Sequence, residues 1–580
     1  MNRNSESHFA QVPRMERPRS KFDRGHQLLT TINEGELVPI YMDEVLPGDT
    51  ARVQLNGLIR MSTPIYPIMD NCYMDTYFFF VPARLLWEHF ENMFGENDTD
   101  YWAEDTEYST PKCTIGGTSG LANGSIGDYF GLPTQVTNAL EVNALPARAY
   151  CKIYNEWFRD ENLEAPLMLG YKKTDDGGTT ADASKVTANA NALDQTTNTN
   201  EAQLYAMKPA RAGKFHDYFT SCLPSPLKNE DPVTIPLGGN APVRAFIDTE
   251  LTKEAKGYGT VTGTKSGTWT YGSMVTDSQN ARMLEGYPQQ LSGNYFWASK
   301  TAGETDYTNK NYSHQAYMGA DLSSVTAATI NDLRQAIALQ HIFESDARNG
   351  TRYREFLSGT WGVTSPDSRL QIPEYIGGQR IAINVNQVVQ TSQTDTKTGQ
   401  ALGNTAAYSL TTCSKQMADY AATEYGYIIG LAVVRVEHSY QQGLATKWTR
   451  GGRFTYYDPR LAALGEQPVY NREIYADGSE KDSQIFGYQE AWADYRYKPS
   501  YVTGEMRSNY QTSLDAWHYA DDYDKLPTLS AEWIQEGREN IDRTIAVTSA
   551  VSHQFLCDFW FNETWFREMP IYSIPGIERI

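Results

Sequence analysis

Residues that could perform catalysis occur throughout this chain, but their spacing does not match a known catalytic or metal-binding motif. The nine histidines never occur in the HExxH or HxxxH spacing that places two imidazoles on one face of a helix. His216 and Asp217 are adjacent, yet neighbouring residues of a strand point to opposite faces, which favours a structural hydrogen-bonded pair. The six cysteines show no CxxC pairing, as is typical of reduced structural thiols. We therefore predict no metal ion and no cofactor.

Two glycine-rich runs were compared with phosphate-binding and nucleophile motifs. The run 257–267 contains Lys265 and Ser266, but it lacks the first glycine of a phosphate loop and does not lie between a strand and a helix. Neither this run nor the run 116–127 has a nucleophile in GxSxG register. Carboxylates are abundant, but a glycosidase pair is defined by a separation of roughly 5–9.5 Å in space, which a sequence does not give. The motifs predict no catalytic residues and no enzyme activity.

Strand-forming segments dominate the chain and predict an all-β fold. The apolar residues Val53, Leu55, Ile59 and Met61 occupy odd positions between mostly polar even ones, as in a strand with one face in a core. Residues 427–434 form a continuous apolar run, which indicates a buried strand. Such segments are spread over the chain without a repeat of 20–50 residues. This pattern favours one antiparallel β-sandwich with long insertions and a few helices over a string of separate domains.

Charge distinguishes an N-terminal arm, residues 1–26, from a single domain over residues 27–580. The whole chain has a net charge of −21, whereas residues 1–24 carry six cations against three carboxylates. A positive arm on an acidic body indicates an anionic partner at one face. A solvated tail, or an arm that grips a neighbouring subunit, is the alternative. The candidate nucleic-acid-binding residues are Arg3, Arg14, Arg17, Arg19, Lys21 and Arg24.

Three insertions in the domain are expected at about 95–130, 172–203 and 244–318. The first is rich in Gly, Asn, Asp and Thr and is predicted to be loop, and the second is nearly free of large apolar residues, as in a solvated or disordered insert. The third is rich in Tyr, Ser, Gly and Asn, a composition typical of adaptable recognition surfaces. A hairpin whose aromatic residues only pack on each other is the alternative. The candidate recognition residues are Tyr258, Trp269, Tyr271, Tyr287, Tyr295 and Trp297.

Short phrases along the whole chain carry a family resemblance. They include PRSKFDR at 18–24, FFFVP at 78–82, HDYFTSCLP at 216–224, YQQGL at 440–444, SLDAWH at 513–518 and MPIY at 569–572. With these phrases in family order from end to end, the chain resembles the major capsid proteins of the microviruses, small tailless single-stranded-DNA phages. Within them it resembles the gokushovirus branch.

The resemblance implies an eight-stranded antiparallel jelly-roll β-sandwich. Its copies would form pentamers and a 60-copy T=1 icosahedral shell around a circular single-stranded DNA genome, assembled in the bacterial host cytoplasm. The implied partners are an internal scaffolding protein, a small basic DNA-binding protein, a DNA pilot protein and a host cell-surface receptor. The insertion at 244–318 would be a surface protrusion used for host attachment. Because the body is acidic, genome condensation is expected to depend on the separate basic protein.

Two other function classes stay open. One is a lectin-like carbohydrate-binding β-sandwich, with the aromatic insertion as its binding face. The other is a glycoside hydrolase, which needs a carboxylate pair in a cleft. The apolar runs are far shorter than the ~20 residues that span a bilayer, and the N-terminal region is polar and basic. We therefore expect neither a membrane span nor an ordinary signal peptide.

Overall fold

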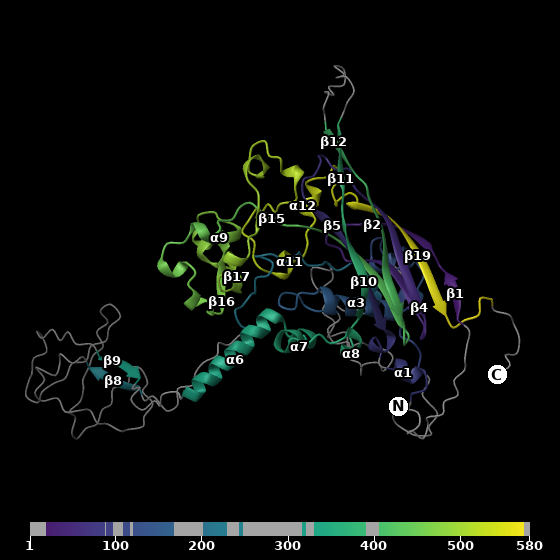
Figure 1. Ribbon diagram of the computed structural model, residues 1–580, viewed down its shortest axis with the longest axis horizontal. Coiled ribbons are helices and arrows are strands. Elements are labelled where there is room, and N and C mark those ends of the chain that lie inside the picture. Colours follow the sequence, from purple (N-terminus) through teal and green to yellow (C-terminus); the bar gives the residue numbers. More distant parts are fainter. Residues whose placement is uncertain are drawn as a thin grey trace, which may run out of the picture. The chain divides into compact units, whose positions relative to one another are not determined.

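The computed structural model describes residues 19–87, 89–96, 108–116, 120–167, 201–228, 330–389 and 405–572, together with the backbone of 243–247 and 316–320. The chain separates into two compact units, one made of Met1–Asn229 with Phe343–Ile580 and the other of Glu230–Ile342. The described part of the first unit is mostly antiparallel β-sheet with few helices (Figure 1).

Two antiparallel sheets form the body of the first unit. A five-stranded sheet has the order β1-β19-β4-β13, with β2 also paired to β19, and a four-stranded sheet has the order β10-β5-β14-β3. The strands of the five-stranded sheet are β1 (Ser20–Asp23), β2 (His26–Ile32), β4 (Thr50–Met61), β13 (Thr411–Ala421) and β19 (Phe555–Arg567), and those of the four-stranded sheet are β3 (Val38–Val45), β5 (Cys72–Pro82), β10 (Glu374–Ala382) and β14 (Gly426–Val436).

One apolar core joins the facing sides of these two sheets, so they form a β-sandwich. Phe559 and Phe561 of β19 contribute to it from one sheet, and Phe78 and Phe80 of β5 contribute from the other. The predicted alternation along β4 is confirmed, because its odd positions are buried and Arg52 and Arg60 at even positions are exposed. The period of two therefore places one face of the strand in the core.

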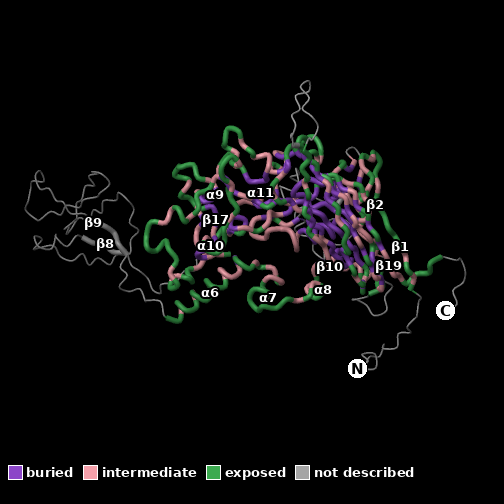
Figure 2. The backbone as a smooth tube through the Cα atoms, turned by 45° about the horizontal axis from the view of Figure 1, so that its top comes forward, coloured by how far each residue is buried: buried purple, intermediate pink, exposed green. Residues whose placement is uncertain are grey.

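A second apolar core covers the outer face of the four-stranded sheet. Phe79 of β5 and Leu431 of β14 pack there against a layer that includes Tyr150 of helix α3 (Leu145–Ile153). Nearly every residue of β14 is consequently buried. The buried residues are concentrated inside the sandwich, beside the labelled β10 and β19 (Figure 2). The buried strand predicted at 427–434 is confirmed, and its continuous apolar run reflects the fact that both of its faces are covered.

The outer face of the five-stranded sheet is not covered in this way. Leu29, Leu556 and Trp560 are 71%, 52% and 48% exposed on it. Asp558 pairs with Leu29 on one side and with Leu58 of β4 on the other, so these side chains lie together on one surface.

The remaining elements are short and surround the sandwich. Helix α3 ends at Ile153, and a π-helical turn, Tyr154–Phe158, follows it. The loop predicted over 95–130 is wrong at β6 (Lys112–Ile115) and α2 (Ile126–Tyr129), because isolated apolar residues of these elements insert into the second core. Short helices and strands of this unit are α1 (Phe90–Met93), α2 (Ile126–Tyr129), α4 (Glu201–Ala206), α7 (Tyr353–Trp361), α8 (Asp367–Leu370), α9 (Asn471–Ile474), α10 (Ala493–Arg496), α11 (Ala531–Ile534), α12 (Glu539–Asp542), β6 (Lys112–Ile115), β7 (Leu140–Asn143), β11 (Val385–Val389), β12 (Thr405–Ser409), β15 (Ser439–Tyr440), β16 (Glu466–Tyr470), β17 (Ile485–Glu490) and β18 (Ser500–Tyr501).

In the second unit, strands β8 (Val243–Ile247) and β9 (Ala316–Ala320) pair antiparallel, with Val243 opposite Ala320 and Ile247 opposite Ala316. The long helix α6 (Ile330–Asn349) begins in this unit and continues into the first. Among the described residues, no helix is both long and apolar enough to cross a membrane.

Candidate functional site

The cations predicted to bind nucleic acid fall into two groups. Arg3, Arg14 and Arg17 lie outside the described residues. Arg19, Lys21 and Arg24 belong to the segment that forms β1 and leads into β2, so this part of the predicted arm is built into the five-stranded sheet.

Each of the three described cations has a carboxylate partner in its own chain. Lys21 Nζ lies 2.9 Å from Asp23 Oδ1, and Arg19 Nε lies 3.8 Å from Glu568 Oε1. Arg24 pairs with Asp43 and also lies over the ring of Trp565. These contacts partly offset the charges that the sequence suggested were available for phosphates, most strongly at Arg24, whose partner Asp43 is the least exposed.

A buried carboxylate ties the start of this sheet to its last strand. Glu563 of β19 accepts hydrogen bonds from the Tyr41 hydroxyl at 2.9 Å and from Trp565 Nε1 at 2.8 Å, and its Oε1 lies 2.7 Å from His26 Nδ1. The hydrogen bond to Glu563 raises the pKa of His26. Burial raises the pKa of Glu563, but the hydrogen bonds from His26, Trp565 and Tyr41 outweigh it and lower that pKa.

A second group of ionisable side chains is buried where β14 ends. The imidazole of His438 lies between two carboxylates, with Nδ1 2.9 Å from Asp521 Oδ1 and Nε2 3.1 Å from Glu536 Oε1. Lys214 Nζ lies 3.7 Å from Asp521 Oδ2, and the fully buried Glu34 accepts a long hydrogen bond of 3.4 Å from the backbone N–H of Ile541. We name these five side chains, Glu34, Lys214, His438, Asp521 and Glu536, the buried charge cluster.

Protonation in the buried charge cluster follows from this geometry. Burial lowers the pKa of His438, but Asp521 and Glu536 overcome that effect and raise it to about 10. Burial and the nearby charge of Glu536 raise the pKa of Glu34 well above its ordinary value. His438 is therefore an imidazolium at pH 7, and the raised pKa of Glu34 favours its protonated form. Among the described residues, no group of three or more His, Cys, Asp or Glu side chains is arranged to hold a metal ion.

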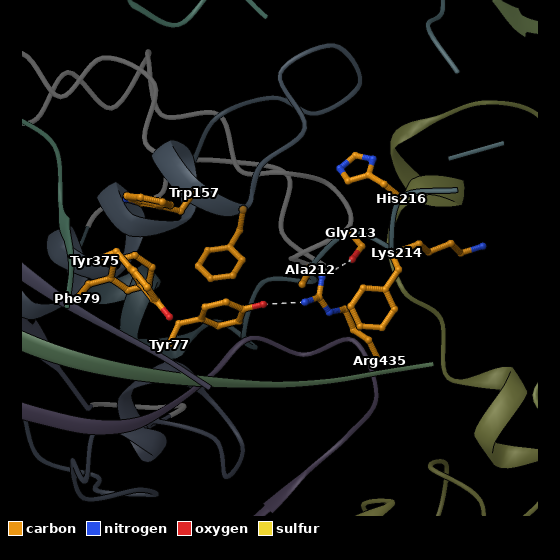
Figure 3. Close-up of a pocket in the computed structure, with 11 residues that line it drawn as sticks. Tyr77, Phe79, Trp157, Ala212, Gly213, Lys214, His216, Tyr375 and Arg435 are labelled. Carbon is orange, nitrogen blue, oxygen red and sulfur yellow. Dashed lines mark hydrogen bonds between the residues drawn. The ribbon is translucent and has the colours of Figure 1, made fainter. Parts of the chain in front are cut away.

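A pocket of about 410 Å³ opens on the outer side of the four-stranded sheet, and its walls are largely aromatic (Figure 3). Arg435 of β14 donates to the Tyr77 hydroxyl at 2.7 Å and to the carbonyl oxygen of Gly213 at 3.3 Å, and its guanidinium lies 4.2 Å from the centre of the Phe215 ring. The pocket lining contains no Asp or Glu, so it does not supply the carboxylate pair of a glycosidase. Its residues are Tyr77, Phe79, Trp157, Phe158, Ala212, Gly213, Lys214, Phe215, His216, Tyr375 and Arg435.

Sequence reasoning missed both the pocket and the buried charge cluster. Their members come from segments hundreds of residues apart, so no local spacing reveals them. The one available signal was the phrase around His216 and Asp217, and Asp217 does have a structural role: it accepts hydrogen bonds from the backbone of Phe219 and Thr220 and from the Tyr440 hydroxyl.

The six candidate recognition residues, from Tyr258 to Trp297, all lie outside the described residues. The structure describes the two strands at the ends of their insertion, β8 and β9, which pair with each other.

Known proteins match this chain over nearly its full length. The family model described as "Capsid protein (F protein)" matches residues 10–577. The chain is 41% identical over 569 residues to the capsid protein VP1 of Spiroplasma virus 4, covering 97% of this chain and 96% of the relative. It is 38% identical over 577 residues to capsid protein VP1 of Bdellovibrio phage phiMH2K, covering 99% and 98%, and 38% identical over 608 residues to capsid protein VP1 of Chlamydia phage 1, again covering 99% and 98%.

These matches confirm the resemblance to microvirus capsid proteins that the sequence phrases indicated. They lend no support to the lectin-like and glycoside hydrolase alternatives. The chain belongs to the family of phage capsid proteins described as Capsid protein (F protein), whose members are structural components of a virion that assemble into a shell rather than enzymes.

Proposed function

We propose that this chain is the major capsid protein of a small single-stranded-DNA phage, and that 60 copies form a T=1 icosahedral shell around a circular genome. The observation that carries the proposal is the family match from end to end, with relatives that are all capsid proteins.

The strand pairing supports an eight-stranded jelly roll as the building block of this shell. Without β1, the sandwich has eight strands, which in chain order are β2, β3, β4, β5, β10, β13, β14 and β19. The first pairs with the eighth, the second with the seventh, the third with the sixth and the fourth with the fifth. Such nesting results when one long antiparallel hairpin is rolled into two facing sheets, the architecture of many viral capsid domains.

The proposed partners follow from the same function. They are a scaffolding protein, a small basic DNA-binding protein, a DNA pilot protein and a host receptor, with assembly in the host cytoplasm. Genome packing by a separate basic protein is supported by the net charge of −21 and by the carboxylate partners of Arg19, Lys21 and Arg24. We assign the remaining arm cations, Arg3, Arg14 and Arg17, to contact with the genome.

Sedimentation of the purified chain, with negative-stain imaging of the fastest fraction, tests the shell. We expect uniform icosahedral particles, or pentamers that a scaffolding protein converts into them. A chain that stays monomeric under all conditions, including with the scaffolding protein present, would overturn the proposal.

We also propose that the insertion between β8 and β9 carries host attachment. Because β8 and β9 pair at its two ends, the insertion can be exchanged between relatives at these strands without changing the sandwich. The exchange should transfer the host range measured by adsorption. Unchanged adsorption would assign attachment to another part of the chain.

A further inference from the structure

Residues 443–465, between β15 and β16, display large aromatic side chains on the surface of the first unit. Trp448 and Phe454 are 73% and 76% exposed, and Tyr456 and Tyr457 are 54% and 47% exposed. We name residues 443–465 the aromatic loop. An isolated exposed apolar residue is ordinary, but four large ones within ten positions indicate a contact surface.

The aromatic loop is anchored near both of its ends to the rest of the unit. The Leu444 backbone N–H donates to the Arg472 carbonyl at 2.7 Å, and the Thr446 hydroxyl donates to Glu473 Oε2 at 2.7 Å. Near the other end, Trp492 Nε1 donates to the carbonyl oxygen of Leu461 at 2.8 Å. The exposed rings are thus presented by a backbone that is already organised for binding, which reduces the ordering cost of association.

The charges of the aromatic loop indicate an acidic partner. It contains four cations and one carboxylate, whereas the whole chain carries −21. Arg450 pairs with Asp494, Arg460 pairs with Asp458, and Lys447 lies over the ring of Trp448. Arg453 is exposed and has no carboxylate partner among the described residues. The loop therefore offers rings and one unpaired guanidinium.

We propose that the aromatic loop docks on an acidic surface of a second copy of this chain, with Trp448, Arg453 and Phe454 at the centre of the contact. The proposal rests on the proposed shell function. In a shell of identical acidic copies, every neighbour supplies the same acidic surface. A contact between two different surfaces of the same chain forms a closed assembly when the rotation between copies returns to its start. Aromatic residues and arginine are also the types that contribute most at the centres of protein interfaces.

Single-stranded DNA is a less suitable partner for the aromatic loop. Affinity for phosphates grows with the number of cations that release counterions. Two of the four cations here are already paired with carboxylates of the same chain. The uncommitted surface is dominated by apolar rings, which a protein interface buries.

A matched pair of substitutions tests the contact. Arg453→Gln and Arg460→Gln make the same chemical change at two exposed arginines of one loop. Arg460 pairs with Asp458, whereas Arg453 has no carboxylate partner in the part of the chain that the structure describes. Each variant is placed in the complete phage genome, and particles from the host are counted after sedimentation. We expect Arg453→Gln and Phe454→Ser each to reduce fast-sedimenting particles by about tenfold or more, and Arg460→Gln to stay within about twofold of the parent.

The outcomes separate this proposal from the shell itself. If the parent chain forms no particles, the proposed function fails. If the parent forms particles and Arg453→Gln and Phe454→Ser form equally many, the contact is overturned while the shell stands. Normal particle numbers with reduced DNA content would overturn it too, because the loop would then bind the genome. Thermal unfolding of the unassembled variants, expected to match the parent, shows that any loss reflects assembly rather than misfolding.

Discussion

The two sheets of the sandwich differ in what covers their outer faces. The four-stranded sheet is enclosed, with the central core on one side and a second core on the other, whereas the five-stranded sheet leaves its outer face exposed. Two histidines close to the sheets differ in the same way. The side chain of His438 beyond β14 is 1% exposed, while that of His26 in β2 is 49% exposed. The same type of residue should therefore contribute very different amounts to the free energy of unfolding in the enclosed and the exposed environment.

The largest effect is expected at the buried histidine. His438→Gln removes the imidazolium between Asp521 and Glu536. It leaves the buried Glu536 without a cation and Asp521 with only Lys214, at a cost of about 3–5 kcal/mol. His26→Gln is the control. His26 is half exposed, and the buried Glu563 keeps its hydrogen bonds from Tyr41 and Trp565, so the loss should be smaller than at His438. Chemical unfolding of the unassembled variants measures both. Equal losses in the free energy of unfolding for the two variants would show that the two histidines do not differ in this way.

A matched pair of leucines tests the apolar part of the comparison. Leu431→Ala in β14 leaves a cavity in the second core and should cost about 2–5 kcal/mol. Leu556→Ala, on the exposed face of β19, should change stability by no more than about 0.5 kcal/mol. Both are measured by unfolding of the unassembled chain. A large loss at Leu556 would show that its face is covered even before assembly.

The pH dependence should report the buried charge cluster. The pKa of His438 is raised from an ordinary 6.5 to about 10, so its stabilisation is complete below pH 6.5 and is lost as the pH rises towards 10. Glu34 acts in the same direction, because its raised pKa favours the folded state only while the acid keeps its proton. The temperature of unfolding should therefore fall between pH 6.5 and 10.

Glu34→Gln separates the two contributions to this fall. The amide needs no proton, so the variant should unfold at a higher temperature than the parent at pH 8.5 and should lose less stability per pH unit. A variant that is less stable than the parent at both pH 5 and pH 8.5 would show that Glu34 is ionised in the folded chain.

The smallest effect concerns the arm that precedes the five-stranded sheet. Replacing Arg14 and Arg17 by Gln should reduce the salt dependence of single-stranded oligonucleotide binding by about 1.4 in log–log slope, about 0.7 for each cation. The same change at Arg19 and Lys21 should leave the slope unaltered, because these side chains face Glu568 and Asp23. Equal reductions in this slope for the two pairs would show that Arg19 and Lys21 also contact the nucleic acid.

Local patterns in the sequence predicted what depends on neighbouring residues. The alternation in β4 identified its one buried face, and the continuous apolar run in β14 identified a strand buried on both faces. Both patterns can be read within a single strand. The loop predicted at 95–130 was wrong at β6 because composition outweighed single apolar residues such as Ile115. The buried charge cluster could not be predicted, since folding alone brings Glu34 next to residues some 500 positions later. The six candidate recognition residues lie outside the described residues, and their role stays a prediction.

The position of β19 has a consequence for how the chain is made. Among the described residues this strand is the last, yet it lies inside the five-stranded sheet, between β4 on one side and β1 with β2 on the other. During synthesis β2 and β4 emerge from the ribosome early. More than four hundred further residues are added before β19, which pairs with both, emerges. Long-range pairing of this kind is slow to form and exposes apolar surface meanwhile. Prematurely terminated chains therefore lack an interior strand rather than an edge strand, and their five-stranded sheet stays interrupted between β4 and β2.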